Sequence, residues 1–242
     1  AAETLFALRH YGLTWDGKEK YDHFAGRAYV RLHQDPEYER LQPAIEEVLH
    51  ALERGELREE VNRILLAQMA TMHALNARYD LLVWESDIVR AGLLQKALAL
   101  LEQSPHVFRP REGKYAGALV MDASPVIPGL EDPFFVLLRS NGTATYYAKD
   151  IAFQFWKMGI LEGLRFRPYE NPYYPGLRTS APEGEAYTPK AEETINVIDV
   201  RQSHPQALVR AALALAGYPA LAEKAHHLAY EKVVLSPATA RA

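Results

Sequence analysis

Three residues of this sequence could together recognise a flat, positively charged group: Tyr146, Asp150 and Gln202. A guanidinium carries five N–H donors in a planar fork and no acceptor. A carboxylate such as that of Asp150 can accept two of these donors, and an aromatic ring such as that of Tyr146 can lie against the plane. The amide of Gln202 both donates and accepts hydrogen bonds, which suits a further amino group of the same ligand.

Each of these residues also has an ordinary structural explanation. An acid at the start of a helix stabilises that helix by roughly 0.3–1 kcal/mol, which would account for Asp150. A strand tyrosine such as Tyr146 can simply pack in the core, and a glutamine after a strand is common. His204, just before Pro205, could reach the sheet edge beside Gln202, or it could merely start the next helix. The residue types alone leave both interpretations open.

The elements that must position Tyr146 and Asp150 can be predicted from the pattern around them. Asn141-Gly142 indicates a turn, because both residues tolerate positive φ. Residues 143–147 are β-branched or aromatic and predict a short strand. From Asp150 onward, apolar residues at three- and four-residue spacing predict a helix. We therefore expect Tyr146 near a strand end and Asp150 in the first helical turn, at the edge where open α/β sheets bind ligands.

The rest of the chain shows helical spacing in its first half and mixed patterns after it. Helices are predicted over residues 1–11, 41–57, 61–79, 86–103 and 204–217, with Ser86 as an N-cap. Strands are predicted over residues 115–121, 134–138, 143–147, 194–200 and 230–235. Residues 162–191 are rich in proline, glycine and tyrosine, which predicts a long irregular loop of the kind that often carries function.

Composition and motifs exclude several classes of protein. The 242 residues include no cysteine, so disulfides, thiolate chemistry and cysteine-bound zinc are excluded. There is no apolar run of about 18 residues, so we expect a soluble chain. The adjacent His226 and His227 project in different directions and have no third ligand at suitable spacing, so no metal site is predicted. Phosphate-loop, dinucleotide-binding, G-x-S-x-G hydrolase and H-E-x-x-H metalloprotease motifs are absent as well.

A net charge of −4 does not exclude a nucleic-acid partner, because a local patch can supply the phosphate contacts. The sequence offers one small basic cluster that could meet a nucleic-acid phosphate: Phe108, Arg109, Arg111 and Lys114. A solvated surface hairpin explains the same residues more simply.

Residues 139–152 resemble the R-x-D-G-T-x-T-Y-x-x-x-D-I-A signature of arginyl-tRNA synthetases, which are class I aminoacyl-tRNA synthetases. The matching residues are Gly142, Thr143, Thr145, Tyr146, Asp150, Ile151 and Ala152, with Asn141 where the family usually has aspartate. Residues 196–204 are similar to the family strand that ends in a substrate-contacting glutamine, here Gln202. Asp80 and the Glu85-Ser86 pair also resemble the family. The likeness extends from the first residues to about Glu231 and is close to forms from thermophilic bacteria.

The resemblance implies an α/β fold: the second half of a Rossmann-like nucleotide-binding fold, with parallel strands and a helix-rich insertion region. Residues 1–112 would form the helical segment and insertion region. Residues 113–235 would form a strand-containing insertion and the second half of the catalytic domain, with 236–242 as a tail outside the family pattern. Tyr146, Asp150 and Gln202 would line the arginine pocket. The implied substrates are L-arginine, ATP with Mg²⁺ and tRNA-Arg, in a cytoplasmic and typically monomeric enzyme.

Two family signatures for ATP, of the His-x-Gly-His and Lys-Met-Ser-Lys-Ser types, do not occur in the sequence, and the residues from Lys232 depart from the family. We therefore expect an interior fragment of the catalytic domain, with catalytic residues unknown and no ligase activity of its own. The alternative is a non-catalytic binding or structural protein built on a synthetase-derived scaffold. The joint presence of Tyr146, Asp150 and Gln202 favours the enzyme fragment.

Overall fold

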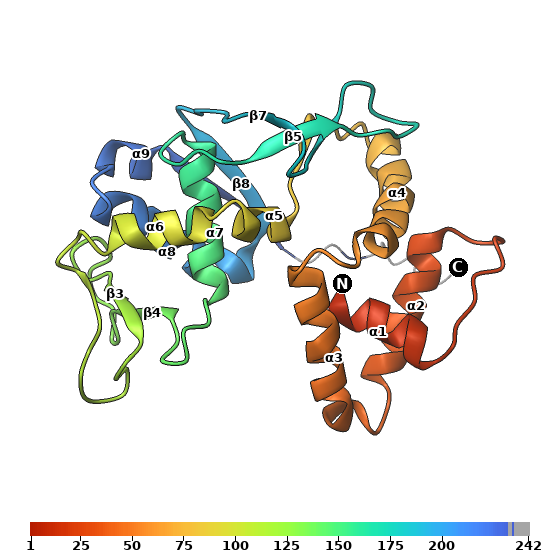
Figure 1. The fold of residues 1–242 in the computed structure, drawn as a ribbon, viewed down its shortest axis with the longest axis horizontal. Helices are drawn as coiled ribbons and strands as arrows, with labels where there is room; N and C mark the ends of the chain where they lie inside the picture. The colour runs from red at the N-terminus through yellow and green to blue at the C-terminus, as the bar shows by residue number, and fades with distance from the viewer. Residues whose placement is uncertain (232–233, 235–242) are drawn as a thin grey trace. The chain divides into compact units, whose positions relative to one another are not determined.

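The computed structural model describes residues 1–231 and 234, which form two compact units (Figure 1). The first unit contains residues 1–89 and 165–185, and the second contains residues 90–164 and the described residues from 186 onward. The sequence analysis placed domain boundaries after residues 112 and 235 on the basis of the family resemblance, whereas the two units are defined by compactness. The predicted domain boundaries therefore stay a prediction. The last predicted segment, residues 236–242, lies outside the described residues.

Helices make up most of the first unit: α1 (Ala2–His10), α2 (Tyr21–His33), α3 (Tyr38–Glu53) and α4 (Arg58–Ala74). The apolar faces of α1, α2 and α3 share one core, in which Ala7 and Leu32 are fully buried. The predicted helices over 1–11, 41–57 and 61–79 are thus confirmed as α1, α3 and α4, with ends shifted by a few residues.

A small mixed sheet completes the first unit: β1 (Leu81–Leu82), β5 (Arg165–Pro168), β6 (Arg178–Ser180) and β7 (Glu185–Ala186). The strand order is β1-β6-β5-β7, with β1 parallel and β5 antiparallel to β6. The prediction of an irregular loop over residues 162–191 was therefore wrong in part. The three strands it contains are two to four residues long, too short to show alternation, and most of its prolines and glycines lie in the turns between them.

The helix predicted over residues 86–103 is two helices, α5 (Glu85–Arg90) and α6 (Leu93–Leu101). Gly92 separates them with a φ of 70°, a left-handed conformation that no helix continues through. Ser86 lies inside α5 and is not the N-cap we predicted. Its hydroxyl accepts a hydrogen bond from Arg58 at 2.9 Å instead.

The second unit contains a three-stranded antiparallel sheet and the long helix α7 (Tyr146–Lys157). The strands are β2 (Val107–Phe108), β3 (Leu119–Asp122) and β4 (Phe134–Leu138), in that order. The predicted strand 134–138 is confirmed, whereas the strand predicted over 115–121 begins only at Leu119.

The strand predicted over residues 143–147 is wrong. Apart from a single bridge between Leu138 and Ala144, this segment is a turn that leads straight into α7, so Tyr146 is the first helical residue. Asp150 consequently lies one full turn further along α7 and not in its first turn. The two threonines that suggested a strand serve other purposes: Thr143 closes the turn, and Thr145 precedes the helix in an extended conformation.

The second unit ends in a strand–helix–strand arrangement with parallel strands. Its elements are β8 (Thr194–Asp199), the 3-10 helix η1 (Val200–Gln202), α8 (Ser203–Leu215), α9 (Pro219–Glu223) and β9 (Ala225–Tyr230). β8 and β9 pair in parallel from Thr194 with Ala225 to Asp199 with Tyr230. The parallel strands and the helix over 204–217 are confirmed. The last strand, predicted over 230–235, lies earlier as β9, and residues 232, 233 and 235 are outside the described part.

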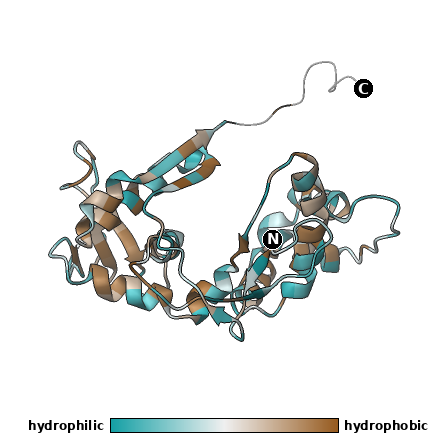
Figure 2. Cartoon of the chain, turned by 90° about the horizontal axis from the view of Figure 1, so that it is seen from above, coloured by the Kyte–Doolittle hydropathy of each residue, from teal (hydrophilic) through white to brown (hydrophobic). Residues whose placement is uncertain are grey.

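One face of the β8–β9 pair is apolar and exposed. Ile195 and Val197 of β8 are 64% and 61% exposed, and Leu228 of β9 is 58% exposed. In Figure 2, brown and teal bands alternate along the strand pair that includes β9. The opposite face carries polar side chains that pack against helices, as described below.

Candidate functional site

Tyr146 and Asp150 lie on one face of α7, because residues four apart on a helix are neighbours with Cβ atoms about 5–6 Å apart. The opposite face of the helix is apolar, and both Ile151 and Phe155 are fully buried there. Tyr146 is 53% exposed and Asp150 is also exposed, so this pair is accessible to a ligand.

The turn that leads into α7 is closed by its own side chains. The Oδ1 atom of Asn141 accepts hydrogen bonds from the backbone nitrogen of Thr143 at 3.0 Å and from its hydroxyl at 2.7 Å. Gly142 has a φ of 84°, which favours glycine at this position. The hydroxyl of Thr145 donates to the carbonyl of Val136 at 2.9 Å. The start of α7, and with it Tyr146, is thereby fixed to β4.

On this face of α7, Asp150 supplies the negative charge and Tyr146 is neutral. Partial burial, a hydrogen bond with Tyr147 and the charge of Asp150 raise the pKa of Tyr146 to about 12. The two tyrosine rings lie with their centroids 4.0 Å apart. Tyr146 is therefore a neutral hydroxyl near pH 7, able to donate as well as accept, and its ring stands beside a carboxylate.

Lys157 continues the same stripe of α7, eleven residues after Tyr146, and the sequence analysis missed it. Burial lowers the pKa of Lys157 to about 8, while the charge of Asp150 acts in the opposite direction. Its ammonium lies 5.0 Å from the ring centroid of Phe153 and donates to Oδ1 of Asn196 at 2.6 Å. The helical spacing of Lys157 from Tyr146 and Asp150 could have identified it from the sequence.

Beneath this stripe, a network of side-chain amides joins α7, β8 and α8, which lie side by side (Figure 1). Nδ2 of Asn196 donates to Gln206 at 2.7 Å and to Gln154 at 3.3 Å. Nε2 of Gln154 in turn donates to the hydroxyl of Thr194 at 2.7 Å. Gln154, Gln206 and Thr194 are all buried. We call Gln154, Thr194, Asn196 and Gln206 the amide network; the signal for it was glutamine at apolar-face positions of two helices.

Gln202 and His204 follow β8 at its carboxyl end, where ligands bind in parallel sheets. The carboxylate of Asp199 holds this turn by accepting from the backbone nitrogen and Nε of Arg201, at 2.9 and 2.8 Å. These bonds, that of the Arg201 side chain first, lower the pKa of Asp199 to about 2. His204 is the second residue of α8, and its ring lies 5.1 Å from that of Phe135 in β4.

The four predicted site residues thus form two pairs within one unit: Tyr146 with Asp150, and Gln202 with His204. Tyr146 and Asp150 lie near the start of α7, and Gln202 and His204 lie where α8 begins. The starts of α7 and α8 both lie against β4, through Thr145 and His204, and the amide network ties the two helices to β8.

The adjacent histidines of β9 contact two different partners. Among the described residues, no group of three or more His, Asp or Glu could hold a metal ion. His226 lies 2.6 Å from a carboxylate oxygen of Glu193, whereas Nε2 of His227 donates to the carbonyl of Ile198 at 2.9 Å. The two rings point to opposite faces, as neighbouring residues of a strand do.

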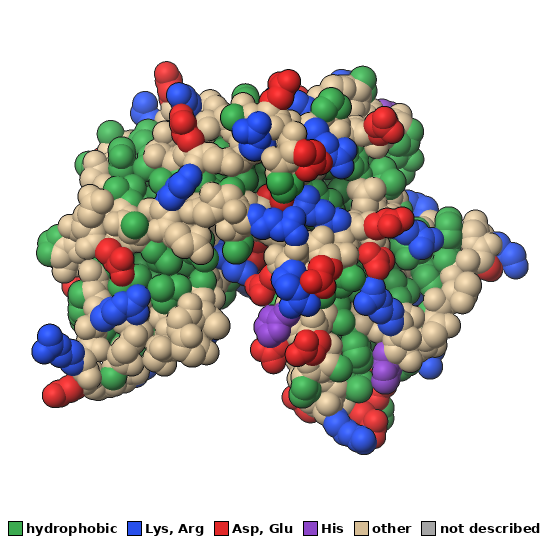
Figure 3. Space-filling view, viewed as in Figure 1, with side chains coloured by type: hydrophobic (Ala, Val, Ile, Leu, Met, Phe, Trp, Pro, Cys, Tyr) green, Lys and Arg blue, Asp and Glu red, His purple; other side chains and the backbone are tan. Residues whose placement is uncertain are grey.

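The basic cluster at β2 is partly neutralised. Lys114 pairs with Asp132 at 2.9 Å, and Arg109 lies 3.8 Å from Glu102. On the face of the molecule shown in Figure 3, acidic and basic side chains are interspersed.

Within the described residues, no helix is both long and apolar enough to cross a membrane.

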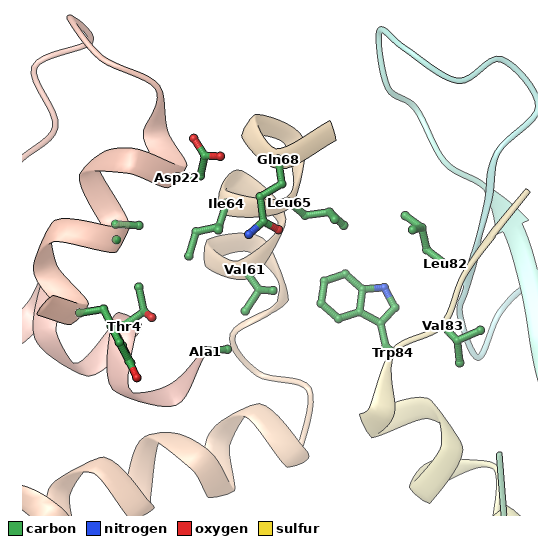
Figure 4. Close-up of a pocket in the computed structure, with 13 residues that line it drawn as sticks. Ala1, Thr4, Asp22, Val61, Ile64, Leu65, Gln68, Leu82, Val83 and Trp84 are labelled. Carbon is green, nitrogen blue, oxygen red and sulfur yellow. The ribbon is translucent and has the colours of Figure 1, made fainter. Parts of the chain in front are cut away.

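A cavity of about 460 Å³ lies elsewhere, in the first unit, and is lined mostly by apolar side chains of α1, α2 and α4 with residues 82–84. Figure 4 shows the indole of Trp84 and the side chains of Leu65 and Leu82 around this space, with Asp22 at its edge. Asp22 is already paired with Lys20 at 3.1 Å. The cavity therefore presents little polar chemistry, and it contains none of the predicted site residues.

The comparisons with known proteins point to one family, although no protein-family model matches the chain. The arginine–tRNA ligase of Thermus thermophilus is 99% identical over 235 residues, which cover 97% of this chain and 40% of that protein. That of Deinococcus radiodurans is 50% identical over 244 residues, covering 99% of this chain and 40% of the other. A solved structure of an arginyl-tRNA synthetase from Campylobacter jejuni matches with a TM-score of 0.50 at 16% identity, over 96% of this chain and 41% of that one.

The helix-rich α/β architecture with parallel strands is that of part of an aminoacyl-tRNA synthetase. By sequence, the chain belongs to the arginine–tRNA ligase family, and the resemblance predicted from residues 139–152 and 196–204 is confirmed. The chain spans about 40% of the length of the relatives it matches.

Proposed function

We propose that this chain carries the arginine-binding part of an arginine–tRNA ligase, an enzyme of protein biosynthesis. The observation that carries the proposal is the exposed Tyr146–Asp150 pair on one face of α7. The near identity of the chain to a segment of an arginine–tRNA ligase supports it.

In this proposal Asp150 accepts two N–H donors of the arginine guanidinium, and the ring of Tyr146 lies against the guanidinium plane. The hydroxyl of Tyr146 is neutral near pH 7, because its pKa is raised to about 12. Gln202, at the carboxyl end of β8, contacts the α-amino end of the substrate, with His204 beside it. The amide network and β4 hold these two pairs of residues in register.

In the whole enzyme, the carboxylate of arginine would attack the α-phosphate of ATP, and pyrophosphate would leave with Mg²⁺ as its counterion. The arginyl group would then pass from AMP to tRNA-Arg, in the cytoplasm. That chemistry depends on positioning and on charge neutralisation at the phosphates. Neither the His-x-Gly-His nor the Lys-Met-Ser-Lys-Ser type of sequence is in this chain. We therefore expect no arginine-dependent ATP–pyrophosphate exchange from the chain alone.

Calorimetric titration of the purified chain with L-arginine tests the binding role, with L-lysine as the matched ligand control. We expect selective arginine binding that Asp150→Asn weakens at least about tenfold, since a hydrogen bond to a charged group is worth about 1.5–3 kcal/mol. Glu223→Gln removes an exposed carboxylate at the end of α9, outside the site, and should leave the affinity unchanged.

A folded chain that binds no arginine would contradict the proposed role and favour a non-catalytic protein on a synthetase scaffold. Equal binding of L-lysine, or full affinity in Asp150→Asn, would show that Asp150 is not the guanidinium partner. Pyrophosphate exchange by the purified chain would refute the expectation that it is inactive alone.

A further inference from the structure

A small polar pocket of about 170 Å³ lies in the first unit, where the end of α4 and the segment after it meet residues 173–175. Four aromatic rings line it, and we call it the tyrosine pocket: His73, Tyr79, Tyr173 and Tyr174. The tyrosines at 173 and 174 belong to the proline-rich segment that the sequence singled out. None of the residues proposed to bind arginine contributes to this pocket.

The ring of Tyr174 lies at the base of the tyrosine pocket, and two neighbouring rings contact it. Tyr174 is 6% exposed, and its ring makes edge-type contacts with two other rings. Its ring centroid lies 6.0 Å from that of His73 at an interplanar angle of 72°, and 5.8 Å from that of Tyr79 at 88°. His73 and Tyr79 therefore both stand upright on the ring of Tyr174. Tyr79 is 40% exposed, which leaves part of its ring open to a ligand.

The ring of Tyr174 is held in place by hydrogen bonds within the chain, without any ligand. The hydroxyl of Tyr174 donates to the carbonyl of Ala77 at 2.8 Å. Oδ1 of Asn171 accepts from the backbone nitrogens of Tyr173 and Tyr174, at 3.0 and 2.6 Å. A site whose rings are already ordered spends little conformational entropy on binding.

The same pocket offers a polar edge from Asn76, Arg78 and Asp80. No hydrogen bond joins these three side chains to the rest of the described chain. Together they present an amide that donates and accepts, a guanidinium that donates and a carboxylate that accepts. Stacking on aromatic rings combined with hydrogen bonds to the base edge is how proteins recognise unpaired nucleobases in RNA.

We propose that the tyrosine pocket binds one unpaired nucleobase, stacked on Tyr79 and hydrogen-bonded along its edge by Asn76 and Asp80. The volume suits a single heterocycle, since pockets for drug-sized ligands are about 300–1,000 Å³. Arg78 then neutralises the phosphate attached to that base. The base can come from an RNA strand or from a free nucleotide, and the proposal does not depend on arginine binding.

Binding is measured by fluorescence anisotropy of a labelled single-stranded oligoribonucleotide, with adenosine monophosphate as an unlabelled competitor. Tyr79→Leu should weaken binding by about tenfold or more, the usual effect of losing one aromatic stacking partner. Tyr79→Phe keeps the ring and should bind like the wild type, which separates stacking from misfolding. Tyr218→Leu is the matched control, because Tyr218 is 37% exposed and lies outside the pocket.

Competition by adenosine monophosphate would identify a free nucleotide as a sufficient ligand, and competition only by oligonucleotide would identify an RNA strand. The proposal is overturned if no oligonucleotide or nucleotide binds, or if Tyr79→Leu binds as the wild type does. Equal affinity for an abasic oligonucleotide of the same length would also overturn it, because phosphate attraction would then explain the binding. Asp150→Asn should leave oligonucleotide binding unchanged, so failure here and failure of arginine binding are separate results.

Discussion

The two units bury polar groups in different ways. The first unit buries an ion pair: Asp87 is 4% exposed and accepts hydrogen bonds from Arg58 and, at 2.6 Å, from the hydroxyl of Ser180. The same hydroxyl accepts from the backbone nitrogen of Trp84 at 2.9 Å. The second unit buries the amide network, whose members carry no charge, and Lys157 reaches it from the edge. Each cluster joins three secondary-structure elements.

The difference teaches where each unit is vulnerable. Removing one partner of a buried ion pair leaves an uncompensated charge, which is costlier than the pair itself is stabilising. The ion pair is also imperfect, since Nε of Arg58 is buried and finds no partner among the described residues. In the amide network each lost bond leaves a neutral group, which costs less, but Asn196 serves three partners at once. The stability of the first unit should therefore fall most when one charge of the ion pair is removed. The stability of the second unit should fall most when Asn196 is removed.

The largest effect should come from Asp87→Ala, which leaves the half-buried Arg58 without its carboxylate. We expect a loss of about 3–5 kcal/mol in the free energy of unfolding, measured by urea denaturation. The double variant Arg58→Met/Asp87→Leu should recover part of that loss, because no charge remains unpaired. Glu183→Ala removes an acid from the exposed pair with Arg167 in the same unit and should change stability little. If Asp87→Ala behaves like Glu183→Ala, the ion pair is not what holds α4, α5 and β6 together.

Asn196→Ala should come next, since Gln206 and Lys157 lose their hydrogen-bond partner and Gln154 loses one of its two. At about 1–3 kcal/mol for each buried group left unsatisfied, we expect a loss of roughly 2–4 kcal/mol in the free energy of unfolding. Gln202→Ala removes an exposed amide in the same unit and should stay within about 0.5 kcal/mol of the wild type. A loss for Asn196→Ala no larger than that for Gln202→Ala would mean that water replaces the network at no cost.

The sequence predicted the long helices better than the turn and the short strands, and the candidate site residues stay a prediction. Tyr146 and Asp150 were identified by the signature and by their place at the start of a helix, and a strand wrongly assigned to residues 143–147 displaced Asp150 by only one turn. Helical spacing extends over many residues, so α1, α3, α4 and α8 could be predicted. The two- to four-residue strands β5, β6 and β7 could not, because pairing with distant segments, and not their own pattern, makes them strands.

The two buried clusters escaped the sequence analysis for a related reason. A glutamine on the apolar face of a helix, such as Gln154, shows that a buried polar partner must exist, but not which residue it is. Its partners Thr194 and Asn196 are 40 and 42 residues away. Asp87 and Ser180 are 93 residues apart. Such pairs depend on tertiary packing, which a single sequence does not reveal.

A smaller effect, and one that depends on pH, is expected for Lys157. Its folded-state pKa is lowered to about 8, so between pH 8 and 10.5 the unfolded chain binds a proton that the folded chain does not. The free energy of unfolding of the wild type should therefore rise with pH across this window relative to Lys157→Met, by roughly 1–3 kcal/mol. Lys157→Arg stays protonated throughout and should show no such rise. Parallel pH profiles for the wild type and Lys157→Met would place Lys157 in solvent, apart from the amide network.

The smallest effect should come from Arg201→Gln, which removes an exposed guanidinium from a carboxylate and so contrasts with the buried pair of the first unit. The Arg201 side chain is the main reason that the pKa of Asp199 falls from 3.8 to about 2, and the backbone nitrogen of residue 201 is the second. In the variant the pKa of Asp199 should rise toward 3.8 but stay below it, as read from a carbon-13 NMR titration. Because the lowered pKa stabilises the fold only while Asp199 is ionised, wild type and variant should lose this difference as the pH falls through the folded-state value. An unchanged pKa would mean that the backbone bond alone holds the turn before Gln202.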